Sequence, residues 1–270
     1  GAKKRLDEFL EEGFSSYAAA RDRPDRPATS RISPYLRFGN ISVRQVWHAA
    51  MAHAMRSGSA GRNLEKFQSE LGWREFSYHL LYHNPDMARR NLQSRFDGMP
   101  WRDDDNAFKA WQQGKTGYPL VDAGMRELWA TGWMHNRVRM VVASFLIKDL
   151  LIDWRKGEAW FWDTLVDADA ANNAASWQWV AGSGADAAPF FRIFNPVLQG
   201  EKFDPEGAYV RRWVPELEKL PSNLIHRPWE AAPKDLLRED TSSPAANYPA
   251  RIVDHRQARE RALEALGNLG

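Results

Sequence analysis

The chain contains no cysteine among its 270 residues. This absence excludes disulfide bonds, thiolate catalysis, iron–sulfur clusters and zinc sites built from cysteine. A long apolar run is also missing, because the best candidate, residues 141–152, contains Lys148 and Asp149 and is shorter than the roughly 18 residues that a membrane span requires. The charged stretch 3–12 does not resemble a signal peptide. We therefore expect a soluble, cytoplasmic protein.

A large net charge is absent as well, because 37 Lys and Arg face 35 Asp and Glu, which leaves a formal net charge of +2. Such a chain does not bind polyanions through bulk charge. Of the cations, 27 are Arg, whose planar guanidinium binds phosphate through two parallel hydrogen bonds, so the composition is compatible with a local phosphate-binding face. Tryptophan is abundant, with 13 residues, and packing in a helical core is the simpler explanation for it.

Apolar residues recur at helical spacing through most of the chain. This spacing predicts helices over 62–83, 106–113, 120–132, 135–153 and 254–266. Ser42 and Gln45 form the pattern of a capping box and predict the start of a further helix. No two-residue alternation is bounded by hairpin turns, so we expect no sheet. Because no repeat or linker divides the chain, a single all-α domain is the economical interpretation.

One predicted helix carries a mixed polar and aromatic face. Glu70, Trp73, Arg74 and Ser77 stand at positions i, i+3, i+4 and i+7, and Tyr78 on the same helix is expected in the core. Such a face can bind a flat heteroaromatic ligand, or it can form an ion pair and a Trp anchor between helices. These residues by themselves favour the second interpretation.

Metal and dinucleotide motifs are weak. Asp167 and Asp169 stand two residues apart, but the intervening positions do not match a calcium loop, and a helix cap is the simpler role. His79 and His83 share a helix face without an obvious third imidazole, so we expect no metal. The glycine-containing segment 182–187 matches a relaxed dinucleotide fingerprint, but it lacks the preceding strand that this motif needs.

Five segments of the chain follow one another in an order typical of one protein family. They are Thr-Ser-Arg-Ile-Ser-Pro-Tyr-Leu-Arg-Phe-Gly (29–39), Ser-Glu-Leu-Gly-Trp-Arg-Glu-Phe (69–76), Trp-Met-His-Asn-Arg-Val-Arg-Met (133–140), Asp-Ala-Asp-Ala-Ala-Asn-Asn-Ala-Ala-Ser-Trp-Gln-Trp (167–179) and Phe-Arg-Ile-Phe-Asn-Pro (191–196). Together they resemble the helical FAD-binding domain of the photolyase and cryptochrome family. The resemblance implies an all-α fold around a folded-back FAD, which faces a cavity on a DNA-binding surface.

The resemblance also implies which residues hold the cofactor. The positions that match phosphate contacts are Tyr17, Thr29, Ser30, Arg31, Ile32 and Ser33. Asp167 and Asp169 match the acidic pair beside the adenosine and the flavin ring, and Arg139 matches the cation paired with the first of them. Asn173 matches the residue facing flavin N5, where a neutral amide favours reduced flavin and therefore repair. Phe67 and Arg74 are the remaining matched cofactor positions.

A second group matches the lesion pocket of cyclobutane pyrimidine dimer photolyases, namely Glu70, Trp73, Asn136 and Met140. In this assignment Glu70 binds a thymine edge, Trp73 stacks on a base, and Met140 fills the apolar side. The candidates for DNA-strand contacts are Arg21, Arg137 and Gln199. Residues 133–140 do not reproduce the His-bearing segment in which six-four photolyases resemble one another.

Three tryptophans match the family's electron relay to photoexcited flavin: Trp177, Trp154 and Trp101. Indole suits this role because it is rigid and readily oxidised, and it can stay buried with its single donor bonded. The family's N-terminal α/β antenna domain has no counterpart in the sequence. We therefore expect residues 1–270 to form a single helical FAD-binding catalytic domain without antenna function, and to be a monomer.

The implied function is light-driven repair of cyclobutane pyrimidine dimers in DNA, in which excited reduced FAD gives an electron to a flipped dimer. The enzyme class is deoxyribodipyrimidine photolyase. The alternative is a cryptochrome-like blue-light signalling flavoprotein without repair activity.

Overall fold

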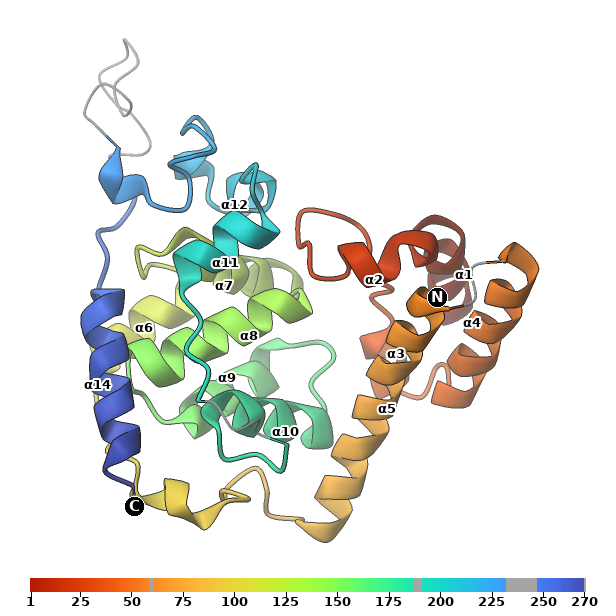
Figure 1. Ribbon diagram of the computed structural model, residues 1–270, viewed down its shortest axis with the longest axis horizontal. Coiled ribbons are helices and arrows are strands. Elements are labelled where there is room, and N and C mark those ends of the chain that lie inside the picture. Colours follow the sequence, from red (N-terminus) through yellow and green to blue (C-terminus); the bar gives the residue numbers. More distant parts are fainter. Residues whose placement is uncertain (59–60, 187–190, 232–246, 270) are drawn as a thin grey trace.

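The computed structural model describes residues 1–58, 61–186, 191–231 and 247–269, and Figure 1 shows their arrangement. The α-helices are α1 (Ala2–Glu12), α2 (Tyr17–Ala20), α3 (Ser33–Arg37), α4 (Val43–Ser57), α5 (Arg62–His83), α6 (Asp105–Gln112), α7 (Pro119–Thr131), α8 (Asn136–Ser144), α9 (Trp154–Thr164), α10 (Ala170–Ala181), α11 (Pro196–Phe203), α12 (Ala208–Trp213) and α14 (His255–Gly267). Short 3-10 turns cover Phe14–Ser16, Ser94–Gly98, Pro215–Leu217 and Pro228–Glu230. The described ranges contain no strand, so the all-α prediction is confirmed. No helix within them is long and apolar enough to cross a bilayer.

Local sequence signals account for several helix boundaries. The capping box at the start of α4 is confirmed, because the Gln45 backbone N–H donates to Ser42 Oγ at 3.2 Å and the Ser42 backbone N–H donates to Gln45 Oε1 at 2.8 Å. The prediction of a helix over 62–83 is confirmed by α5 at both ends. Gly132 follows α7 with a φ of 68°, a left-handed conformation that ends a helix readily when the residue is glycine.

The predicted helix over 135–153 is wrong in its second half. The α-helical hydrogen bonds stop at Ser144, and the next turn is a π-helix in which the Leu150 N–H donates to the Phe145 carbonyl oxygen at 3.0 Å. Leu151 then has a φ of 56°, which an L-residue rarely adopts, and this conformation stops the helix. Residues 141–152 are all buried, so their apolar side chains face inward on every side and the spacing does not mark the break.

Two apolar clusters lie on either side of α5, which runs diagonally through Figure 1. The smaller one is formed by α1, α2, α4 and α5 and includes Phe14, Val46 and Phe67. The larger one is formed mainly by α6 to α10 and α12 and includes Trp111 and Trp177. Because α5 also packs against α10, it joins the two clusters and brings side chains of the N-terminal helices toward those of α8 to α10.

Candidate active site

Asp169 joins α5 to the first turn of α10. Its Oδ1 accepts from the backbone N–H groups of Ala171 at 3.0 Å and Asn172 at 2.8 Å, so the residue caps α10 as predicted. Its Oδ2 accepts from the Arg74 guanidinium at 3.3 Å and from the Tyr78 hydroxyl. Burial by itself would raise the pKa of Asp169, but the hydrogen bonds from Tyr78 and Asn172 outweigh it and lower the pKa. The carboxylate is therefore charged and held in place from two helices.

The expectation that Tyr78 packs in the core is wrong. Its side chain is 41% exposed, and the Arg74 guanidinium lies 5.2 Å from the centre of its ring. The phenol turns outward because its hydroxyl has a charged acceptor in Asp169, which a position among apolar side chains would not offer.

Asp167 is buried two residues earlier and pairs with Arg139 of α8. Arg139 Nη2 lies 2.9 Å from Asp167 Oδ2, and Arg139 Nε donates to the Met134 carbonyl oxygen at 2.8 Å. The other carboxylate oxygen, Asp167 Oδ1, is buried and accepts no hydrogen bond from the described residues. A buried acceptor without a donor is costly, so this oxygen fits a bound ligand that donates a hydrogen bond to it.

Asn173 projects from the first turn of α10, and Glu158 of α9 fixes the orientation of its amide. Asn173 Nδ2 donates to the backbone carbonyl oxygen of Glu158 at 3.0 Å and to its Oε1 at 2.9 Å. Both amide hydrogens are thereby used, and Asn173 Oδ1 is left as an acceptor for a ligand N–H. Burial raises the pKa of Glu158, although the hydrogen bond from Asn173 opposes the shift. We call Asp167, Asp169, Asn173, Arg139 and Glu158 the α10 site.

The predicted phosphate-binding loop presents free hydroxyl groups. The side-chain hydroxyls of Thr29, Ser30 and Ser33 form no hydrogen bond within the described part of the chain. The loop backbone is held from outside, because Arg5 Nε donates to the Ser30 carbonyl oxygen at 3.1 Å. Free hydroxyls on a held backbone are suitable donors for phosphate oxygens.

Arg31 and Ile32 fix the middle of this loop. Arg31 has a φ of 50°, in the left-handed region that non-glycine residues seldom occupy, and its guanidinium lies 4.1 Å from the centre of the Trp133 ring. Ile32 is buried in the smaller apolar cluster. An uncommon backbone conformation persists where its surroundings fix it, as this stacking and burial do.

Tyr17 and Phe67, both expected to contact the cofactor, are neighbours in the smaller cluster. Their ring centres are 5.4 Å apart with the rings edge to face, and Phe9 and Phe14 pack beside them. Burial raises the pKa of Tyr17 far above its ordinary value, so its hydroxyl keeps its proton. It can therefore donate a hydrogen bond at any physiological pH.

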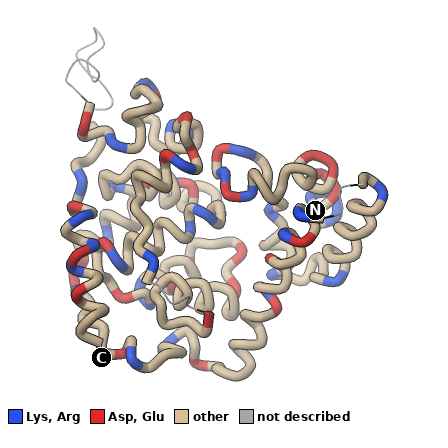
Figure 2. Tube along the Cα trace, in the orientation of Figure 1, with Lys and Arg blue, Asp and Glu red and all other residues tan. Residues whose placement is uncertain are grey.

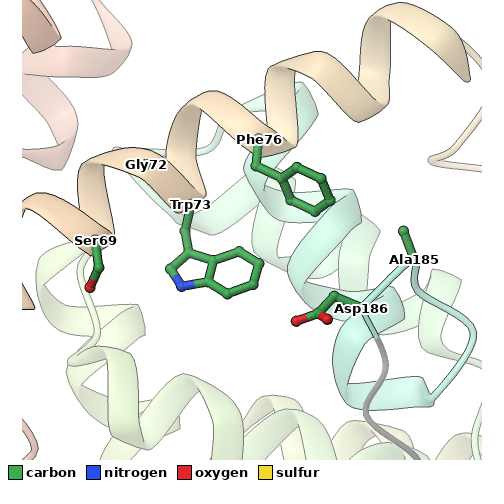
Figure 3. A pocket seen from close by; sticks show the side chains of 6 residues that line it. All are labelled: Ser69, Gly72, Trp73, Phe76, Ala185 and Asp186. Carbon is green, nitrogen blue, oxygen red and sulfur yellow. The ribbon is translucent and has the colours of Figure 1, made fainter.

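Trp73 borders an open cleft between α5 and the residues that follow α10 (Figure 3). The cleft has a volume of about 430 Å³ and is lined by Ser69, Gly72, Trp73, Phe76, Ala185 and Asp186. The indole is 48% exposed, and the Phe76 ring packs edge-on against it at 5.7 Å. No atom of the described residues lies within 4 Å of the place where a side-chain carbon on Gly72 would stand, so this glycine leaves the cleft open. A flat ring can stack on Trp73 here.

The other predicted lesion residues do not line this cleft. Asn136 and Met140 lie one turn apart on α8, where Asn136 Nδ2 is 4.0 Å from Met140 Sδ. Glu70 faces the end of α2 and contacts Arg21. The structure thus places the four predicted lesion residues on two helices, and only Trp73 belongs to the cleft.

Four charged residues meet where α2, α5 and α8 approach one another. Arg21 contacts Glu70 directly, and Lys66 Nζ lies 3.2 Å from Glu70 Oε1. Asp22 Oδ2 lies 3.0 Å from Arg137 Nη2, and Asp22 Oδ1 lies 3.9 Å from Arg21 Nε. We call Arg21, Asp22, Glu70 and Arg137 the charged junction. In Figure 2 the loop after α2 shows the corresponding alternation of positive and negative residues.

The junction changes what the sequence suggested about DNA contacts. Arg21 and Glu70, predicted to bind DNA and the lesion, are paired with each other, and Asp22, which the sequence did not single out, binds both predicted arginines. Gln199 of α11, the third predicted strand contact, has a buried Oε1 without a partner among the described residues. No motif could have revealed the role of Asp22, because its shorter contact is with Arg137, which is distant in sequence.

The three predicted relay tryptophans differ in burial. Trp177 and Trp154 are buried, whereas Trp101 is partly exposed. A side-chain carbon on Gly157 would lie 2.2 Å from the Trp177 ring, so this ring packs directly on the α9 backbone three residues after Trp154. The partial exposure of Trp101 is compatible with its predicted place at the solvent end of a relay.

Trp177 also has a neighbour that the sequence did not identify. The rings of Trp177 and Trp111 have centres 6.3 Å apart, and Trp111 Nε1 donates to the Val142 carbonyl oxygen at 3.0 Å. Among 13 tryptophans, no sequence motif distinguishes Trp111 from those that only fill the core.

The metal and dinucleotide motifs gain no support. Within the described ranges, no group of three or more His, Cys, Asp or Glu lies close enough to hold a metal ion, and His79 and His83 pack ring to ring at 4.5 Å. Gly182 ends α10 with a φ of 96° instead of following a strand. Its place at the end of a helix agrees with the rejection of a dinucleotide fingerprint.

Comparison with known proteins identifies a family. Residues 67–268 match the model described as the FAD binding domain of DNA photolyase. A deoxyribodipyrimidine photo-lyase of Agrobacterium fabrum is 59% identical over 98% of this chain and 55% of that protein. Cryptochrome-1 of Arabidopsis thaliana is 45% identical over 98% of this chain and 40% of that protein. The chain spans about half the length of the curated relatives it matches.

Solved structures agree with the predicted fold. A bacterial class III photolyase from Agrobacterium tumefaciens is similar with a TM-score of 0.92 and 57% sequence identity, over 100% of this chain and 55% of that chain. A Synechocystis cryptochrome is similar with a TM-score of 0.88 and 33% identity, over 98% of this chain and 55% of that chain. The helical FAD-binding fold expected from the sequence is confirmed.

Proposed function

The chain belongs to the photolyase and cryptochrome family, and we propose that it repairs cyclobutane pyrimidine dimers in DNA in a light-driven reaction. The observation that carries the proposal is the fixed amide of Asn173. Glu158 takes both amide hydrogens, so a neutral oxygen acceptor is presented where the family resemblance places flavin N5. A neutral acceptor there favours the reduced flavin that repair needs, without adding a negative charge beside it.

FAD, when bound, supplies the photoexcited electron that opens the cyclobutane ring. The α10 site fits this cofactor: Asp167 Oδ1 offers a buried acceptor, and Arg139 balances the charge of its carboxylate. The free hydroxyls of Thr29, Ser30 and Ser33 would bind the phosphates. These residues bind and orient the cofactor, and the chemistry of electron transfer remains that of the flavin.

The substrate side of the proposal rests on Trp73. Its exposed indole beside an open cleft offers a stacking surface to an extruded base. Glu70 would bind a thymine edge through Oε2, the carboxylate oxygen that pairs with neither Arg21 nor Lys66. The dimer would thus be oriented by residues from the cleft and the charged junction together.

The test is a repair assay with purified, FAD-loaded protein and a short duplex that contains one thymine dimer. Near-ultraviolet light in the presence of a reductant should remove the dimer, and a sample kept in the dark should not change. The variant Trp73→Ala should bind FAD normally, as judged by its absorbance spectrum, and should repair more slowly because the stacking surface is lost. A wild-type protein that holds reduced FAD and leaves the dimer intact in light would sink the proposal.

A blue-light signalling flavoprotein is the second candidate, favoured by the similarity to Arabidopsis cryptochrome-1. It would change its flavin spectrum in light but would bind damaged and undamaged DNA equally. A binding competition between dimer-containing and intact duplex therefore separates the two functions.

A further inference from the structure

Asp22 lies between two of the arginines expected to contact the DNA strand. Its Oδ2 is 3.0 Å from Arg137 Nη2, and its Oδ1 is 3.9 Å from Arg21 Nε. Arg21 follows α2, whereas Arg137 belongs to the first turn of α8. One carboxylate therefore binds two guanidiniums that come from opposite sides of α5.

The carboxylate is the replaceable member of this group. The Asp22 side chain is 35% exposed, whereas those of Arg21 and Arg137 are 10% and 18% exposed. Each arginine also has a support of its own: Arg21 contacts Glu70, and the Arg137 guanidinium lies 4.4 Å from the centre of the Phe203 ring. Removing Asp22 from between them would leave both cations in position.

Phosphate can take the place of this carboxylate. Both anions present oxygen atoms that accept paired N–H groups from guanidinium, and phosphate has more oxygens to offer. A DNA phosphate that approaches Arg21 and Arg137 must therefore displace Asp22, which returns to water as an unpaired charge. Every DNA molecule, damaged or not, meets this competition.

We propose that Asp22 occupies the place of a DNA phosphate and thereby weakens binding to undamaged DNA. The inference rests on the proposed function, because it assumes that this face binds DNA. An intact duplex has only its backbone contacts to offset the displacement of Asp22. A duplex with a dimer also stacks a base on Trp73. Asp22 thus keeps binding to the DNA backbone weak without touching the lesion, and stacking at Trp73 supplies the preference for the dimer.

The experiment compares Asp22→Asn with Asp25→Asn. Both changes remove one negative charge from the same loop, but Asp25 binds Arg23, at 2.6 Å, and neither Arg21 nor Arg137. The binding of fluorescent intact duplex and of dimer-containing duplex is measured by anisotropy over a series of salt concentrations, with FAD-loaded protein. Thermal unfolding of both variants checks that the fold is retained.

Asp22→Asn should bind intact duplex roughly two- to fivefold more tightly than wild type, the range expected for loss of a partly exposed ion pair. The slope of the logarithm of the binding constant against the logarithm of the salt concentration should become steeper by about 0.9. The reason is that the phosphate contact no longer releases the Asp22 carboxylate into water. Dimer-containing duplex should gain affinity by the same factor, because both duplexes present the same phosphate, whereas Asp25→Asn should bind both duplexes as wild type does.

The possible outcomes are distinct. If wild type prefers damaged DNA and the two variants bind alike, the role of Asp22 is refuted while the proposed function stands. If Asp22→Asn weakens binding to both duplexes, Asp22 is a structural tether of Arg137 and the inference is overturned. If wild type shows no preference for the dimer but Asp22→Asn alone binds intact duplex more tightly, the phosphate role holds and the repair function fails.

Discussion

The α10 site and the charged junction both consist of carboxylates paired with arginines, yet they differ in burial. The side chains of Asp167 and Asp169 are each 3% exposed. Those of Asp22 and Glu70 are about a third exposed, and these two carboxylates share Arg21. The same chemical groups therefore form a rigid arrangement in one place and an exchangeable one in the other.

The access of water to the ion pairs explains why one arrangement is rigid and the other exchangeable. A buried ion pair that loses one partner leaves an uncompensated charge, so its geometry is strongly held. A pair near water is worth little, because water and salt replace the lost partner. A cofactor that must be held in one orientation suits the first environment, and a DNA strand that must bind and leave suits the second.

We expect the largest effect from a substitution of Trp177, a buried residue of α10. Trp177→Phe keeps an aromatic ring against Gly157 but removes the readily oxidised indole, so photoreduction of bound flavin should be lost while chemically reduced protein still repairs. Transient absorption spectroscopy measures the first property, and the repair assay measures the second. The matched control is Trp111→Phe, which alters an equally buried neighbour and should photoreduce normally. If Trp111→Phe is the inactive variant, the relay runs through Trp111 and the assignment of Trp154 is wrong.

Breaking the Arg139 pair should produce the next largest effect. Arg139→Leu leaves the Asp167 carboxylate buried without a cation and should lower the free energy of unfolding by about 3 to 4 kcal/mol, measured by urea denaturation. Adding Asp167→Asn removes the unpaired charge and should restore part of the loss. Asp22→Asn at the junction should change stability by less than about 1 kcal/mol. If Arg139→Leu and Asp22→Asn lowered the stability equally, the α10 site and the charged junction would not differ in this respect.

His135 should give the protein a pH dependence, because it caps α8 between the two regions. Burial, together with the nearby Arg139 cation, lowers the pKa of His135 to about 4, although Asp22 opposes the shift. The folded protein therefore keeps the ring neutral while the unfolded chain takes up a proton below about pH 6.5, so stability should fall as the pH drops from 6.5 toward 4. The contribution of His135 to this fall is about 2 to 3 kcal/mol.

The measurement compares wild type with His135→Asn over that pH range by urea denaturation. Asparagine can still accept from the Arg137 backbone N–H, so the helix cap is kept. The pKa of buried Asp204 is raised to about 6, mainly by burial, and this group changes stability in the opposite direction in both proteins. The difference between the two curves therefore isolates His135, and coincident curves would contradict the prediction.

Two glycines inside helices should have effects of opposite sign on stability. Gly157→Ala would place a carbon 2.2 Å from the Trp177 ring, and the overpacking should cost about 1 to 3 kcal/mol. Gly72→Ala would meet no described residue within 4 Å and should stabilise α5 by about 0.5 to 1 kcal/mol. Thermal unfolding of the two variants measures whether each substitution raises or lowers the stability. Destabilisation by Gly72→Ala would show that the rim of the cleft is as tightly packed as the interior.

Local sequence patterns were sufficient to predict most of the helices. The spacing of apolar residues and the capping residues located α5 and α4, because these signals act within a few residues of the chain. They failed over 135–153, where full burial hides the π-turn and the left-handed Leu151. They also failed for Tyr78, whose orientation is decided by Asp169 on another helix.

The ordered sequence motifs identified the main residues of the candidate site. They did not identify the residues that bind and orient them. Asp167, Asp169 and Asn173 stand in one motif, so the resemblance identified them together. Glu158 stands 15 residues before Asn173 and has no periodic relation to it, and only the packing of α9 on α10 makes the two meet.

The sequence by itself determined the all-α fold, the family and the identity of the residues on α10, because helical periodicity and short motifs are properties of neighbouring residues. Tertiary structure decided which charges are fixed and which are exchangeable. That difference depends on how much water reaches each pair, and water is excluded only when α8, α9 and α10 close over Asp167 and Asn173. The carboxylates of Asp22 and Glu70 remain beside solvent, at the meeting of helices that are far apart in the chain.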